Sequence, residues 1–146
     1  MVTQLNVVLV EDHDALRELM VDVVAAQGHH VQGIDCAEAL DDALLRTSID
    51  LLIADLNLPG EDGYALVQRF RKAHPLAGVI MVTARTRLED RVNGYAVGAD
   101  VFLPKPVALD ELVAAVQSIA RRLSAQAALV PLPPTDCVRL DARSLV

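Results

Sequence analysis

The sequence lacks tryptophan and has few aromatic residues, cysteines and lysines. Its 146 residues include two Tyr, two Phe and two Cys. Among 13 basic residues, only Lys72 and Lys105 are lysines. Cys36 and Cys137 lie far apart, a spacing that fits neither a zinc site nor a disulfide scaffold. We therefore expect a reducing compartment, and the position of each rare lysine is informative.

Long apolar runs and a basic surface are also missing. Among the longest segments without Asp, Glu, Lys or Arg are residues 73–84 and 123–135, which are too short to cross a bilayer. No secretory signal pattern precedes the acidic residue Glu11. The net charge of −7 argues against direct nucleic-acid binding, which needs clustered Lys and Arg. The sequence predicts a cytoplasmic protein without a membrane segment, in which another domain makes any contact with DNA.

What the sequence does contain is an alternation of apolar runs and helical patterns, with 53% hydrophobic residues. Short apolar runs predict five strands, at residues 5–10, 30–34, 51–55, 79–83 and 101–103. Apolar residues at helical spacing predict five helices, at residues 14–27, 37–46, 64–73, 88–97 and 110–123. Strands that alternate with helices form a parallel sheet covered on both faces. The predicted fold class is therefore α/β, with a doubly wound five-stranded parallel sheet.

Polar residues stand where four of these strands end, and ligands of open parallel sheets bind at that end. They are Glu11 and Asp12 after the first strand, Asp55 in the third, Thr83 in the fourth and Lys105 after the fifth. Neighbouring carboxylates repel unless they share a cation or pair with a base. A few carboxylates with open positions suit Mg²⁺. A phosphoryl group would complete the site, with Asp55 as nucleophile, Thr83 as hydrogen-bond donor and Lys105 as counter-charge.

Each of these residues has a simpler explanation when it is taken alone. Glu11 and Asp12 would stabilise a helix N-terminus through the macrodipole, which is compatible with metal binding. Asp55 would cap the following turn, Thr83 is an ordinary strand residue, and Lys105 would be a surface charge. If only these separate explanations held, five polar residues would stand at one end of the sheet by coincidence.

Four segments resemble a response-regulator receiver domain of the CheY-like type. They are VLVED at residues 8–12, DLNLPGEDG at 55–63, MVTA at 81–84 and GADVFLPKP at 98–106. They occur in the family's order within residues 5–123. The resemblance implies a flavodoxin-like fold with strand order 2-1-3-4-5 and five helices.

The resemblance also implies a phosphorylation site with a metal. A sensor histidine kinase would phosphorylate Asp55 in a Mg²⁺-dependent reaction. Mg²⁺ would be bound by Asp12, Asp55 and the backbone carbonyl of Asn57, with Glu11 acting largely through water. Such a domain accepts a phosphoryl group and loses it slowly, and is not an enzyme with a diffusible substrate.

Phosphate contacts and a switch follow from the same resemblance. Thr83, Lys105 and the Ala84 amide would contact the phosphoryl oxygens. The Lys105-Pro106 peptide bond is expected to be cis, which proline permits at low cost. Thr83 and Phe102 would form a switch, in which Thr83 moves toward the phosphoryl group and the Phe102 ring moves inward. The face made by helix four, strand five and helix five would then be reshaped.

The expected domain boundaries indicate what the receiver domain would control. We expect a receiver domain at residues 1–123, a linker at 124–135, and at 136–146 a tail or the start of a truncated effector domain. The last segment faintly resembles the first strand of the winged-helix domain in OmpR/PhoB-like transcriptional regulators. DNA would then be bound only by an effector domain beyond this chain.

A homodimer through helix four, strand five and helix five is a further expectation, although its usual sequence signature of charged residues is weakened here. That subfamily usually carries Asp where Val101 stands and basic residues where Ala115 and Gln117 stand. Arg91 is therefore expected to lack its usual partners.

Two other functions stay open. The chain would be a stand-alone receiver that binds a partner protein through the same face, or a Mg²⁺-dependent phosphoryl-transfer enzyme. Such enzymes usually carry a second acid two residues after the nucleophile, where this chain has Asn57. Asn57 and Arg85 flank the expected path of an attacking water. His29, His30 and His74 fall at element boundaries and are expected to be solvated.

Overall fold

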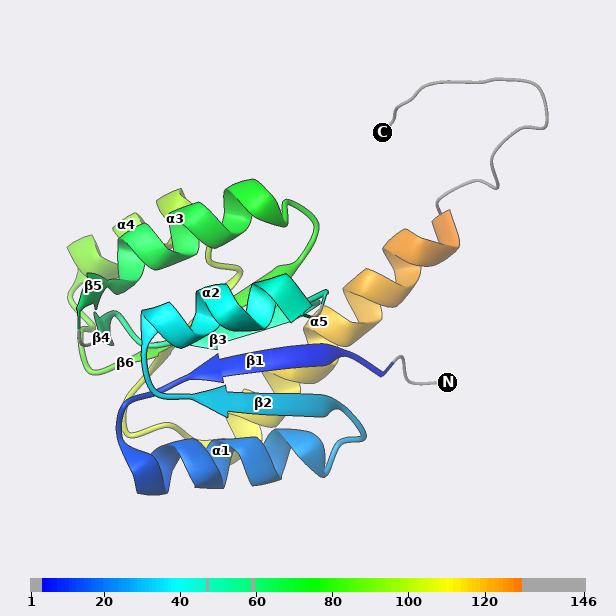
Figure 1. Ribbon diagram of the computed structural model, residues 1–146, viewed down its shortest axis with the longest axis horizontal. Coiled ribbons are helices and arrows are strands. Elements are labelled where there is room, and N and C mark those ends of the chain that lie inside the picture. Colours follow the sequence, from blue (N-terminus) through cyan, green and yellow to red (C-terminus); the bar gives the residue numbers. More distant parts are fainter. Residues whose placement is uncertain (1–3, 47, 59, 130–146) are drawn as a thin grey trace.

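The computed structural model describes residues 4–46, 48–58 and 60–129, and its centre is a parallel sheet (Figure 1). The strands are β1 (Asn6–Val10), β2 (His30–Ile34), β3 (Leu51–Ala54), β6 (Gly78–Thr83) and β7 (Val101–Pro104). They are ordered β2-β1-β3-β6-β7, and all neighbours are parallel. Because β6 and β7 are the fourth and fifth strands of this sheet, the predicted order 2-1-3-4-5 is confirmed.

Helices cover both faces of the sheet. They are α1 (Asp14–Ala25), α2 (Ala37–Arg46), α3 (Gly63–Ala73), α4 (Leu88–Val97) and α5 (Leu109–Leu129). Figure 1 shows α1 and α5 on one face, and α2, α3 and α4 on the other. This three-layer arrangement is the flavodoxin-like α/β fold that the sequence predicts.

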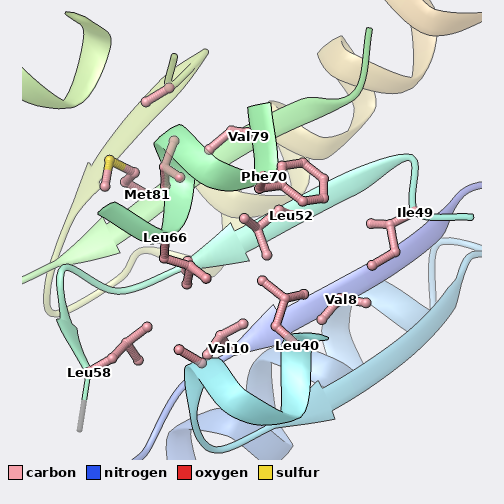
Figure 2. Close-up of a cluster of buried hydrophobic side chains, with 14 of the residues drawn as sticks. Val8, Val10, Leu40, Ile49, Leu52, Leu58, Leu66, Phe70, Val79 and Met81 are labelled. Carbon is pink, nitrogen blue, oxygen red and sulfur yellow. The ribbon is translucent and has the colours of Figure 1, made fainter. Parts of the chain in front are cut away.

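Two apolar layers hold the helices to the sheet. Val8 and Val10 of β1 point toward α2 and α3, as Figure 2 shows, while Val7 and Leu9 point toward α1 and α5. Strands buried on both faces carry continuous apolar sequences instead of an alternating pattern. The apolar runs of the sequence therefore correspond to the inner strands.

A small hairpin replaces part of the turn predicted after the third strand. β4 (Asn57–Leu58) pairs antiparallel with β5 (Glu61–Asp62). Gly60 has a φ of +82°, a left-handed conformation that glycine adopts without steric cost. The hairpin follows Asp55 directly and joins it to α3.

The last helix is longer than predicted. It reaches Leu129 instead of Leu123, because residues 124–129 are rich in Ala, Gln and Leu, which favour helix. The first half of the predicted linker is therefore helical, and Figure 1 shows this end of α5 projecting beyond the sheet. The rest of the linker and the predicted tail at 136–146 lie outside the described residues. Across the helices of the described ranges, none has the length and apolar character to span a bilayer.

Candidate functional site

Three carboxylates meet at the carboxyl-terminal end of the sheet. Glu11 and Asp12 follow β1, and Asp55 follows β3, which pairs with β1. One oxygen from each lies within 4.8 Å of the others. Glu11 and Asp55 are buried, whereas Asp12 is exposed. We call these three residues the acidic cluster; two of its charges are removed from water and the third faces the solvent.

Lys105, the residue after β7, neutralises part of this charge. Its Nζ lies 2.6 Å from Oδ2 of Asp55 and 2.7 Å from Oε1 of Glu11. Burial acts to lower the pKa of the Lys105 ammonium, but its contacts with Asp55 and Glu11 outweigh burial and raise the pKa above its ordinary value. Lys105 is therefore charged at neutral pH. One ammonium against three carboxylates leaves the site negative.

Backbone amides orient the two buried carboxylates. The Asn57 N–H donates to Oδ1 of Asp55 at 3.0 Å, and the His13 N–H donates to Oε2 of Glu11 at 3.0 Å. The His13 side chain caps α1, since its Nδ1 accepts from the Leu16 N–H at 3.2 Å. Each buried carboxylate thus has one oxygen on a backbone amide and the other beside Lys105.

The donor set fits a divalent cation. Oε1 of Glu11 is buried, and its close polar contact within the described residues is the ion pair with Nζ of Lys105 at 2.7 Å. Carboxylate oxygens are the ligands that Mg²⁺ prefers, usually one or two together with water or phosphate oxygens. Of the predicted ligands, Glu11, Asp12 and Asp55 converge. Asn57 lies next to them in β4, where its N–H orients Asp55.

Thr83 lies beside Lys105 at the ends of adjacent strands. The Lys105 N–H donates to the backbone oxygen of Thr83 at 2.9 Å, and Thr83 is fully buried. The Thr83 hydroxyl oxygen accepts from the Arg85 N–H at 3.2 Å. Ala84 follows at an exposed position, and the Lys105-Pro106 bond is cis, as predicted.

The Phe102 ring lies in the interior, with only 8% of the residue exposed. It packs against Gly94 of α4, where an added Cβ would lie 3.0 Å from a ring carbon, and its centroid is 6.4 Å from that of Tyr95. The Phe102 ring is therefore packed between β7 and α4.

Gly63 is a site residue that the sequence did not reveal. A Cβ at this position would lie 2.4 Å from Cα of Leu56 and 2.6 Å from the backbone oxygen of Asp55. Asp62 caps α3 by accepting from the Tyr64 N–H at 3.2 Å. Only glycine allows the start of α3 to approach the Asp55 backbone this closely. The sequence indicated a turn after Asp55, but nothing local indicated this contact.

The comparison with protein families agrees with this geometry. The model of the response regulator receiver domain matches residues 7–117. The transcriptional regulatory protein PmrA of Pectobacterium parmentieri is 37% identical over 118 residues, covering 81% of this chain and 53% of that protein. PhoP of Escherichia coli, also a transcriptional regulatory protein, is 34% identical over 142 residues, or 97% of this chain and 63% of PhoP. The chain thus spans about half to two thirds of these relatives.

Solved structures show the same fold. A CheY-like receiver domain protein from Methanospirillum hungatei superposes with a TM-score of 0.80, at 22% identity, over 85% of this chain and 99% of that one. A receiver domain from Francisella gives a TM-score of 0.76, at 22% identity, over 82% of this chain and 98% of that domain. Together with the family match over most of the chain, these findings show that the chain belongs to the response regulator receiver domain family of two-component systems.

Proposed function

We propose that Asp55 accepts a phosphoryl group from a sensor histidine kinase. The observation that carries this proposal is the convergence of Glu11, Asp12 and Asp55 within 4.8 Å, with Lys105 in contact with two of them. In the transfer, a carboxylate oxygen of Asp55 forms a bond to phosphorus while the phosphorus–nitrogen bond of the phosphohistidine breaks. The electron pair of that bond returns to the imidazole nitrogen, so the product is an acyl phosphate and a free histidine.

The neighbouring residues have distinct roles in this proposal. Lys105, freed from part of its contact with Asp55, neutralises phosphoryl oxygens, while the Thr83 hydroxyl and the Ala84 amide donate hydrogen bonds to them. Bound Mg²⁺ would supply charge neutralisation between the carboxylates and the phosphoryl oxygens. Asp12 is the solvent-exposed member of the acidic cluster. Glu11, which is buried, fixes Lys105 and acts on the metal largely through water.

A phosphorylation assay with a small phosphodonor tests whether Asp55 accepts a phosphoryl group. The protein is incubated with phosphoramidate and Mg²⁺, and its intact mass is measured. We expect one phosphoryl adduct on the wild type and none on Asp55→Ala. Asp42→Ala is the matched control, because it removes the same charge from an exposed position on α2. Absence of an adduct on the wild type, or an equal adduct on Asp55→Ala, contradicts the proposal.

Phosphorylation would act by shifting populations between two packings of the Thr83–Phe102 region. Thr83 is joined to Lys105 through its backbone, and the Phe102 ring packs under α4 against Gly94, so movement of Thr83 has a path to α4. We expect resonances of Phe102 and Gly94 to shift when beryllofluoride and Mg²⁺ are added as a phosphoryl mimic. Unchanged spectra at saturation would rule this switch out.

The output we propose is control of a DNA-binding domain in a longer regulator. The support is that PmrA and PhoP are transcriptional regulatory proteins and that this chain matches about half to two thirds of their length. The intact mass of the natively expressed protein tests it: about one further domain of mass is expected. A native mass equal to that of this chain would favour a stand-alone receiver acting through a partner protein.

A dimer through α4, β7 and α5 would be weak. Val101, Ala115 and Gln117 supply no charges there, and Asp100 is paired within its own chain by Arg71 and Arg122. Sedimentation with and without beryllofluoride is expected to show mostly monomer, and a tight dimer would contradict this. A phosphoryl-transfer enzyme is the less favoured function, because Asn57 stands in place of a second acid.

A further inference from the structure

A third buried carboxylate, outside the acidic cluster, contacts Arg85, the second residue after Thr83. Asp90, in the first turn of α4, is 8% exposed. Its Oδ1 lies 3.1 Å from the Tyr64 hydroxyl and 3.2 Å from Nη2 of Arg85. The Tyr64 hydroxyl is also 3.0 Å from the backbone oxygen of Asp90. We call Tyr64, Arg85 and Asp90 the Arg85 cluster; it joins the start of α3, the loop after β6 and the start of α4.

Arg85 is held on two sides within this cluster. Its guanidinium lies 5.3 Å from the centre of the Tyr64 ring, a cation–π contact, and forms the ion pair with Asp90. Its backbone N–H donates to the Thr83 hydroxyl oxygen. Within the described ranges, the Arg85 side chain forms no hydrogen bond or ion pair with the acidic cluster. Arg85 is therefore tied to Thr83 through its backbone and to α3 and α4 through its side chain.

The negative charge of a phosphoryl group would compete with Asp90 for Arg85. A phosphoryl group on Asp55 places negative charge beside Thr83, two residues from Arg85, and so competes with Asp90 for the guanidinium. If Arg85 leaves, the Tyr64 hydroxyl is the one side-chain donor within the described ranges that stays on the buried Asp90 carboxylate, and an uncompensated buried charge is costly. Asp90 and the phosphoryl group therefore cannot both bind the Arg85 guanidinium fully.

We propose that Asp90 and Tyr64 are positioning residues that hold Arg85 on α3 and α4 and thereby oppose the phosphorylated arrangement. Phosphorylation draws Arg85 to the phosphoryl oxygens, and this release frees the start of α4. The inference rests on the proposed phosphorylation of Asp55. It assigns a new role to Asp90 and Tyr64, which lie outside the acidic cluster.

Binding of the phosphoryl mimic beryllofluoride, with saturating Mg²⁺, tests the proposal. Asp90→Asn keeps the shape and an acceptor for Tyr64 but removes the charge that holds Arg85. We expect it to bind the mimic at least about five-fold more tightly, the lower end of typical coupling between sites. Glu89→Gln is the matched control, because it removes the same charge one residue away, from an exposed side chain that contacts Arg87. It is expected to bind like the wild type.

The effect must pass through Arg85, which a double-mutant cycle measures. In an Arg85→Ala background, Asp90→Asn is expected to leave the affinity for the mimic unchanged. A tightening that persists there, equal affinities of Asp90→Asn and Glu89→Gln, or weaker binding by Asp90→Asn overturns the proposal. If the wild type itself fails to bind the mimic, the proposed phosphorylation is what fails.

A measurement on the wild type decides the matter even if Asp90→Asn does not fold. The Tyr64 ring shifts the resonances of the Arg85 side-chain protons that lie over it. We expect this ring-current shift to diminish when beryllofluoride and Mg²⁺ are added. A shift that is unchanged at saturation means that Arg85 stays on Tyr64, and the proposal is wrong.

Discussion

The two ends of the sheet carry clusters of opposite charge balance. At the carboxyl-terminal end, Glu11, Asp12 and Asp55 share the single ammonium of Lys105. At the amino-terminal end, a single carboxylate, that of Asp100, lies between two guanidinium groups. Arg71 Nη2 is 3.0 Å from Oδ2 of Asp100, and Arg122 Nη1 is 2.8 Å from Oδ1.

The clusters differ in how far the protein's own charges balance them. Both oxygens of Asp100 accept from arginines, and Oδ2 also accepts from the Val79 N–H at 2.8 Å. Arg71 donates further to the backbone oxygens of Ala77 and Gly98. At the other end, three carboxylates share one ammonium, so the charge stays negative. Asp100, Arg71 and Arg122, which we call the Asp100 cluster, therefore join α3, β6, β7 and α5, whereas the negative charge of the acidic cluster suits it to a cation.

The largest expected effect comes from breaking the Asp100 cluster. Asp100→Ala leaves the Val79 N–H unpaired and two guanidinium groups without their shared counter-charge. We expect a loss of about 3 kcal/mol in the free energy of unfolding, measured by urea denaturation. Asp100→Asn keeps one acceptor oxygen and is expected to lose less. Phosphoryl adduct formation at Asp55 should persist in the folded variants. A loss below about 1 kcal/mol for Asp100→Ala would mean that this cluster contributes little to stability.

Removing a charge from the acidic cluster is expected to raise the free energy of unfolding of the metal-free protein. Asp55→Asn removes one of three mutually repelling charges, while its amide oxygen can still accept from the Asn57 N–H. We expect a gain of about 1 kcal/mol in the free energy of unfolding in metal-free buffer. Mg²⁺ should then stabilise the wild type, because it binds the folded state. The difference in the free energy of unfolding between Asp55→Asn and the wild type should narrow or change sign.

Asp42→Asn on the exposed surface of α2 provides the control for this comparison. It changes the net charge equally and is expected to leave stability and its Mg²⁺ dependence unchanged. If Asp55→Asn is less stable than the wild type in metal-free buffer, its ion pair with Lys105 outweighs the repulsion. The acidic cluster would then stabilise the fold, as the Asp100 cluster does.

Sequence patterns predicted the fold and the acidic cluster because both depend on local rules. The predicted ranges 30–34 and 88–97 coincide with β2 and α4, since apolar runs and helical spacing are visible within one element. The rule that parallel strands bring their carboxyl ends together was enough to place Glu11 and Asp55 near Lys105. The sharing of one ammonium by two buried carboxylates needed the structure.

Features that depend on distant packing were missed. The two-residue strands β4 and β5 are too short to show a period, so the sequence indicated only a turn. Arg71 and Arg122 are separated from each other by much of the chain and meet only through Asp100. The composition of residues 124–129 suits both a linker and a helix, and its continuity with α5 decided in favour of helix.

His29, at the amino-terminal end, was predicted to be solvated but is 6% exposed. Its Nδ1 accepts from the Leu5 N–H at 3.0 Å, and burial lowers its pKa from the ordinary 6.5. The stability that the neutral ring contributes is therefore present above about pH 6.5 and lost as the pH falls through the lowered pKa. His29→Asn, whose amide oxygen can accept the same bond without titrating, should lose less stability than the wild type between pH 7.5 and 5. Urea denaturation at both values measures this, with the exposed His30→Asn as control; equal losses in the wild type and His29→Asn would show that the buried ring does not contribute to the pH dependence.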